Sequence, residues 1–252
     1  MTMKIDLNSD MGEGFGAWSI GDDVDRDIMP LISSANIAAG FHAGDPSTMI
    51  DTLRLASRHG VGVGVHPGFH DLVGFGRRHI LASADELVND ALYQLGALRE
   101  LANLEGLKMH HFKLHGALFM HAARDKEFAE KLTSALAIVA PDLFIYCLAN
   151  SAIDHAAKNV GLQRVHEFYA DRDYDDEGNI VFVRKVKQLD PELVAQKVLR
   201  ACQKNEVESV SGKIVKVKFD SVCIHSDTPG ALSLIKKVRA AFDKAGIEVA
   251  AP

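Results

Sequence analysis

The sequence KIDLNSD (residues 4–10) places Asp6, Asn8 and Asp10 on one side of an extended chain and two aliphatic residues on the other. Successive side chains of a β-strand point to opposite faces, so this segment predicts a strand with one polar and one apolar row. A parallel sheet that is covered by helices on both faces is apolar on both faces. This strand therefore needs an enclosed polar space on one side.

The same alternation recurs at the ends of four further strand candidates. Polar residues of one parity occur there in four groups: Asn36 with His42, Gly64 with His66, His111 with Lys113 and His115, and Cys223 with His225 and Asp227. Any one of them could be a hydrogen-bonded core residue or a helix cap, but that explanation must then hold on five strands. Because burying unpaired charge is costly, the rows favour one shared site. The interior and carboxyl mouth of a (β/α) barrel provide such a place.

Seven short apolar runs alternate with helical patterns along the chain. The predicted strands are residues 3–8, 34–39, 61–65, 110–114, 143–148, 164–168 and 221–225. Such alternation indicates parallel strands covered by helices, in a doubly wound sheet or a closed barrel. The polar rows and the length of 252 residues favour the barrel. We therefore expect an α/β fold, a TIM-like (β/α)7 barrel, as one domain over residues 1–252, with polar excursions at 171–186 (turning at 176–179) and 210–219.

Composition excludes several classes of protein. The formal net charge is −6 with mixed signs, which disfavours a nucleic-acid or anionic-membrane partner. No apolar run is long enough for a membrane span, and the acidic residues of the first strand do not fit a signal peptide. Three widely spaced cysteines exclude a disulfide scaffold, so the cytoplasm is the expected compartment. Twelve histidines are the unusual feature, and four of them lie at strand ends.

Individual motifs suggest roles for these residues. Asp10 or Glu13, in a glycine-rich turn, could hold a cation or act as a general base. Asp45 precedes a proline and is predicted to cap a helix. Arg77 could clamp a carboxylate, and an inward Lys113 needs a carboxylate partner, for which Asp6, Asp10 and the substrate are the candidates.

A metal site is one of two possibilities at the strand ends. Asp10, His42, His66 and His115 are plausible ligands for a divalent ion, although no HxH or HExxH motif supports a particular geometry. A metal-free acid–base site is the alternative.

Six motifs in order carry a resemblance to a known family. They are KIDLNSDMGEGFG, SSANIAAGFHAGDP, HPGFHDLVGFGRR, KLHGAL, ADRDYDDEGNIV and IHSDTPGA. Over nearly its whole length the sequence resembles the 5-oxoprolinase A-subunit family, also called the LamB/YcsF family. That resemblance implies a seven-stranded barrel similar to the glycoside hydrolase/deacetylase superfamily. It also implies one component of a three-part hydrolase that opens the cyclic amide of 5-oxo-L-proline (pyroglutamate) to L-glutamate while ATP is hydrolysed to ADP and phosphate.

The resemblance implies partners of the B and C subunit types, and ATP bound at the level of the complex, since no phosphate-binding loop motif occurs in this sequence. Some positions depart from the family pattern: Ala39, Leu114, Phe119, Met120 and Ser226. Three of these are expected beside the site, where they could shift substrate preference.

The predicted site combines both lines of reasoning. The candidate catalytic residues are Asp10, His42, His66, Lys113, His115, His225 and Asp227, and the candidate substrate-binding residues are Asp6, Asn8, Glu13, Arg77, Asp171 and Arg172. Asp10 or His66 would be the base, Lys113 and His115 electrostatic donors, and Arg77 or Arg172 the anion clamp. Two other functions remain open: a stand-alone metal-dependent hydrolase or deacetylase for sugars or N-acyl groups, and a non-catalytic subunit that binds a lactam or carbohydrate.

Overall fold

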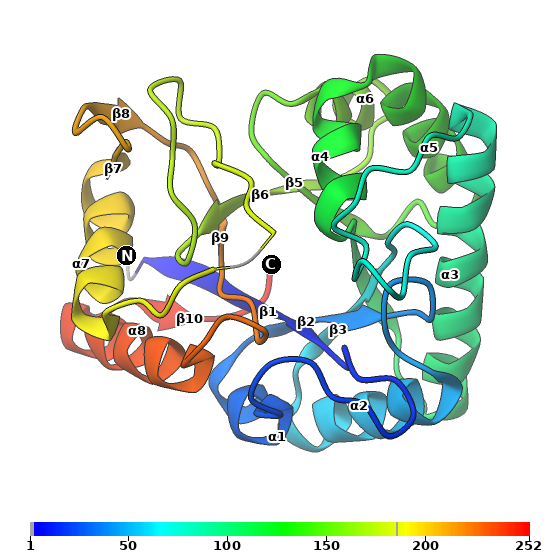
Figure 1. Ribbon diagram of the computed structural model, residues 1–252, viewed down its shortest axis with the longest axis horizontal. Coiled ribbons are helices and arrows are strands. Elements are labelled where there is room, and N and C mark those ends of the chain that lie inside the picture. Colours follow the sequence, from blue (N-terminus) through cyan, green and yellow to red (C-terminus); the bar gives the residue numbers. More distant parts are fainter. Residues whose placement is uncertain (1–2, 185) are drawn as a thin grey trace.

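A closed ring of parallel strands forms the centre of the computed structural model, which describes residues 3–184 and 186–252 (Figure 1). The ring runs in the order β1 (Lys4–Met11), β2 (Ser34–Ala38), β3 (Gly62–His66), β4 (Met109–Lys113), β5 (Phe144–Cys147), β6 (Arg164–Tyr169) and β9 (Ser221–Cys223). It closes because β9 pairs with both β6 and β1, with Asp6 opposite Ser221 and Asn8 opposite Cys223. The predicted seven-stranded α/β barrel is confirmed.

Helices surround the ring and cover its outer face (Figure 1). They are α1 (Asp25–Ile28), η1 (Met29–Leu31), α2 (Pro46–His59), α3 (Ala84–Leu104), α4 (Gly116–Arg124), α5 (Lys126–Val139), α6 (Ala152–Asn159), α7 (Pro191–Lys204) and α8 (Ala231–Ala245). Their starts follow from local sequence. Ser83 and Glu86 form a reciprocal capping box at α3, and Asp45 accepts hydrogen bonds from the amides of Ser47 and Thr48 at α2, as predicted.

The two polar excursions contain short antiparallel structure. Between 171 and 186, Tyr174 bridges Ile180, and the amide of Gly178 donates to the carbonyl of Asp175, which places the turn where the sequence predicted it. The second excursion forms a hairpin of β7 (Glu206–Glu208) and β8 (Ile214–Lys216), which the sequence pattern left unassigned.

One further strand was also not predicted. β10 (Glu248–Val249) runs parallel to the first residues of β1, with Lys4 opposite Glu248. It occupies the edge of β1 before β9 begins, because β9 pairs with β1 only from Asp6 onward.

The two faces of the strands differ as the alternation predicted. Outward-facing Leu7, Ile37 and Val65 are buried in the apolar core with the helices. The interior instead holds buried polar side chains. Gly64 makes room for one of them, since a Cβ at this position would lie 2.1 Å from Cδ2 of His111. His111 in turn contacts Oδ1 of Asn36 through Nε2 at 2.7 Å.

Candidate active site

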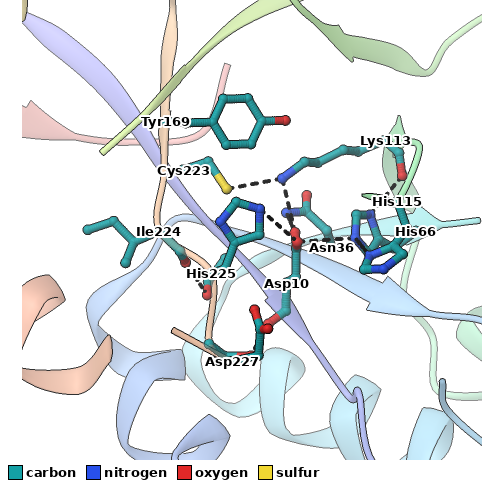
Figure 2. Close-up of polar contacts among 12 residues, drawn as sticks. Asp10, Asn36, His66, Lys113, His115, Tyr169, Cys223, Ile224, His225 and Asp227 are labelled. Atoms are coloured by element: carbon teal, nitrogen blue, oxygen red, sulfur yellow. Dashed lines mark hydrogen bonds and ion pairs between the residues drawn. The ribbon is translucent and has the colours of Figure 1, made fainter. Parts of the chain in front are cut away.

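The carboxyl ends of the strands surround a small cavity at the mouth of the barrel (Figure 2). Its volume of about 30 Å³ is enough for a water molecule. The polar side chains that line it are Asp10, His66, Arg77, Lys113, His115, Tyr169, Arg172 and His225. Phe119, Met120, Phe182 and Val183 contribute the apolar part of the lining. A lactam with a carboxylate is larger than this space, so its entry requires side chains at the cavity to move.

Lys113 carries a fully buried positive charge at the base of this cavity. Its Nζ lies 2.9 Å from Oδ1 of Asp10, 3.2 Å from Oε1 of Glu167 and 3.1 Å from Sγ of Cys223. Burial disfavours the ammonium, but the Asp10 carboxylate outweighs it and holds the pKa of Lys113 well above its ordinary value. Lys113 is therefore a fixed cation rather than a proton donor near neutral pH.

Asp10 is the carboxylate on which the cations and imidazoles converge (Figure 2). Its Oδ2 lies 3.2 Å from Nε2 of His66 and 3.6 Å from Nε2 of His225. Burial favours the protonated acid, but His66 and Lys113 outweigh burial and hold the pKa of Asp10 well below its ordinary value. Asp10 is thus ionised and faces the cavity.

Backbone carbonyls orient two of the imidazoles. Nδ1 of His66 lies 2.8 Å from the carbonyl oxygen of Lys113, and Nε2 of His115 lies 2.9 Å from that of Phe75. A carbonyl only accepts hydrogen bonds, so these two nitrogens carry the protons and the other nitrogen of each neutral ring is left as a lone pair. The backbone of Gly76 packs against His115, since a Cβ there would lie 2.8 Å from its Cδ2.

His42 and Glu13 lie behind these rings and do not line the cavity. The ring of His42 stacks on that of His115 with centroids 3.7 Å apart, and its Nε2 lies 3.2 Å from Oε1 of Glu13. Burial raises the pKa of Glu13 and lowers those of His42 and His115, in each case well away from the ordinary value. Glu13, His42, His66 and His115 could together hold a metal ion.

Two arginines at the mouth are each paired with a carboxylate. Arg77 makes two contacts with Asp227, at 2.8 and 2.9 Å, and also donates to the carbonyl of Arg184. Nη1 of Arg172 lies 2.9 Å from Oδ2 of Asp171, which also receives hydrogen bonds from Thr228 and the His225 ring. Burial opposes ionisation of Asp171, but Arg172 and His225 hold its pKa well below the ordinary range.

The family model described as the LamB/YcsF family matches residues 5–252. The chain belongs to the LamB/YcsF family. A relative from Pseudomonas aeruginosa, named as its first 5-oxoprolinase A-type subunit, is 60% identical over 249 residues, which cover 99% of each chain. A 5-oxoprolinase A-type subunit from Rhodopseudomonas palustris (strain BisB5) is 47% identical over 250 residues, which cover 98% of each.

A solved structure of high identity agrees with this family assignment. The lactam utilization protein from Thermus thermophilus is 42% identical, with a TM-score of 0.92 over 99% of this chain and 100% of that one. A family 4 carbohydrate esterase from Streptomyces lividans is 11% identical, with a TM-score of 0.49 over 98% and 91%. No helix in the described part of this LamB/YcsF chain is long and apolar enough to cross a membrane.

The structure brings most of the predicted site residues of this LamB/YcsF protein together. Leu114, Phe119 and Met120, which depart from the family pattern, line the cavity as expected. Asp6 and Asn8 do not: Asp6 accepts hydrogen bonds from Ser34, Tyr146 and Ser221, deeper in the barrel. Asn8 bridges Lys113 and Glu167 below the cavity.

Two residues of the site were missed by sequence reasoning. Glu167 is the second carboxylate partner of Lys113, and Tyr169 lines the cavity and donates a hydrogen bond to Glu167. Both lie on the inner face of β6, two residues apart. A glutamate in the middle of an apolar strand is the signal that could have identified this row.

Proposed function

We propose that this LamB/YcsF chain is the ring-opening component of an ATP-dependent 5-oxoprolinase, a hydrolase that acts on the C–N bond of a cyclic amide. Support comes from relatives of up to 60% identity that are named as the A-type subunit of 5-oxoprolinase. The observation that carries the proposal is the ionised Asp10 beside the buried cation of Lys113 and the bare Nε2 of His66. A five-membered lactam is a resonance-stabilised amide, so its hydrolysis needs an activated water, an activated carbonyl, or both.

The site residues suit that chemistry. Asp10 or His66 accepts the proton of the attacking water, and groups of this kind typically contribute about 10²–10⁴-fold in rate. Lys113 stabilises negative charge that develops on the oxygen of the lactam. Arg77 keeps donors for a substrate carboxylate, since a guanidinium has five N–H groups and Asp227 and the Arg184 carbonyl take three of them.

ATP coupling belongs to the complex in this proposal. Phosphorylating the amide oxygen of the lactam would make its carbon a good electrophile, and water addition would then open the ring. The sequence has no phosphate-binding loop motif. We therefore assign ATP to two partner subunits of the B and C types or to their interface with this chain, in the cytoplasm.

The test is reconstitution. The full chain is mixed with its two partner subunits, and L-glutamate formed from 5-oxo-L-proline is measured with and without ATP. We expect activity from the three-part mixture only, and neither ATP hydrolysis nor glutamate from the chain alone. Lys113→Ala and His115→Ala should abolish most of the activity. Unchanged activity in both variants would instead indicate a non-catalytic binding subunit.

The imidazole–carboxylate cluster favours one competing function, a stand-alone metal-dependent hydrolase of sugars or N-acyl groups. Hydrolysis of such a substrate by the chain alone, lost on chelation and restored by a divalent metal, would favour it over the 5-oxoprolinase component.

A further inference from the structure

Four buried side chains meet behind the cavity more closely than an acid–base site requires. Glu13, His42, His66 and His115 each offer one ligand atom, and these atoms all lie within 4.8 Å of one another. His66 and His115 also line the cavity, whereas Glu13 and His42 close the cluster from behind. The acid–base roles proposed above use at most two of the four.

The hydrogen bonds of His66 and His115 fix where their lone pairs point. Because the carbonyls of Lys113 and Phe75 take up the protonated nitrogens, Nε2 of His66 and Nδ1 of His115 are bare, and these two atoms are only 3.0 Å apart. Two lone pairs this close repel each other unless a cation lies between them. Rings that ligate metals in proteins are typically held in this way, with the second nitrogen donating to a carbonyl or carboxylate.

The distances fit a small tetrahedral ion. Metal–nitrogen bonds of about 2.0–2.1 Å place neighbouring ligand atoms about 3.3 Å apart in a tetrahedron. Oε1 of Glu13 lies 3.2 Å from Nε2 of His42, 3.3 Å from Nδ1 of His115 and 4.0 Å from Nε2 of His66. Oε2 of Glu13 is buried and has no hydrogen-bond partner in the described part of the chain, so this carboxylate is not otherwise satisfied.

We propose that Glu13, His42, His66 and His115 form a binding site for a divalent transition-metal ion of the zinc type, on the wall of the cavity beside Asp10. Three imidazoles and one carboxylate select such ions over Mg²⁺ and Ca²⁺, which take mainly oxygen ligands. An ion held there lowers the pKa of a bound water. The site is independent of the proposed reaction, since its ligands are set by the fold.

A second cluster in the same chain gives a contrast. Cys147, Asp154 and His166 also lie close enough to hold a metal, but both ring nitrogens of His166 face carboxylates: Nε2 lies 3.0 Å from Asp154, and Nδ1 lies 3.2 Å from Asp220. Two acceptors favour a ring that is protonated on both nitrogens, which has no lone pair for a metal. This cluster therefore serves as the negative control.

The experiment measures metal binding without reference to activity. The full chain is freed of metal with a chelator and titrated with Zn²⁺ by calorimetry, and Co²⁺ is added separately to record its visible absorption. We expect one Zn²⁺ per chain and the strong absorption bands of tetrahedral cobalt. His66→Ala, His115→Ala and Glu13→Gln should each weaken Zn²⁺ binding by more than about 100-fold, whereas His166→Gln should leave it unchanged.

Several outcomes would overturn the site. These are no stoichiometric binding to the folded wild-type chain, a Co²⁺ spectrum of octahedral type, or His66→Ala and His115→Ala variants that are folded by circular dichroism and still bind Zn²⁺ with wild-type affinity. The reconstitution assay separates this inference from the proposed function. Zn²⁺ binding without 5-oxoprolinase activity would leave the metal site standing, and ATP-dependent activity in a chain that binds no metal would do the reverse.

Discussion

Nζ of Lys113 lies 2.9 Å from Oδ1 of Asp10 inside the barrel, where both side chains are almost completely shielded from water. Glu167 supplies a second carboxylate at 3.2 Å. A buried pair of this kind need not add stability over an apolar replacement, but removal of one partner leaves the others uncompensated.

Lys113→Met should therefore lower the free energy of unfolding by about 3–5 kcal/mol, as measured by urea denaturation at pH 7. Lys131 is a matched control, since its Nζ also contacts two carboxylates, Asp85 at 2.9 Å and Glu127 at 3.0 Å, but on the surface. Lys131→Met should cost about 1 kcal/mol or less. Equal losses in the two variants would contradict the role given to burial.

The glycine inside β3 is expected to be sterically required. Gly64→Ala would place a methyl group 2.1 Å from the His111 ring, so the variant should lose roughly 1–3 kcal/mol of stability through overpacking. Gly96 in α3 has no heavy atom within 4 Å of a built Cβ. Gly96→Ala should instead stabilise the chain by about 0.5–1 kcal/mol. Thermal unfolding of the two variants checks both signs.

His166 should make stability depend on pH. Its hydrogen bond with Asp220, together with Asp154, outweighs burial and raises the pKa of His166 above 6.5. A raised histidine pKa stabilises the folded state fully below pH 6.5, and this contribution is lost as pH rises through the folded-state value.

Denaturation curves from about pH 5.5 to 8.5 should thus show a fall in stability that is absent in His166→Gln. His155→Gln, on the exposed face of α6, should keep the wild-type profile. A His166→Gln profile that parallels the wild type would argue against this assignment.

Asp45 should contribute through capping rather than chemistry. Its carboxylate accepts hydrogen bonds from Ser47, Thr48 and the amide of Gly16, and the Thr48 side chain does most to lower the pKa of Asp45 to about 2. Asp45→Ala should cost about 1 kcal/mol. Because the pKa is lowered, that difference from wild type is full above pH 3.8 and shrinks as pH falls toward 2.

Asp51→Ala, a change at an exposed position of the same helix, should be close to neutral. Full 5-oxoprolinase activity of the folded Asp45→Ala variant in the reconstituted complex would agree with a capping role, and a loss of turnover without a loss of stability would not.

The barrel could be predicted because alternation along a strand reports its two environments directly. Asp6, Asn8 and Asp10 do point inward, but a strand rises about 3.3 Å per residue, so Asp6 and Asp10 are separated by about 13 Å of barrel depth. Only Asp10 therefore reaches the mouth. Sequence parity assigns a side chain to the interior and does not say at which level it lies.

Partners that are distant in sequence could not be predicted. Arg77 pairs with Asp227 and Lys113 with Glu167, and no spacing relates these residues because the closed sheet alone brings them together. β10 was missed for a similar reason: two residues give no periodicity, and their pairing depends on the free edge of β1.

The pairing of β1 with β9 and β10 has a consequence for the synthesis of this protein. The first strand to leave the ribosome finds its last neighbours only when residues 221–249 have been made. Until then β1 and β6 each carry an unpaired edge, and the charged interior is open to water. Ring closure joins contacts of very high sequence separation, which folding theory associates with slow formation. The nascent chain is therefore most vulnerable to aggregation through these edges just before translation ends.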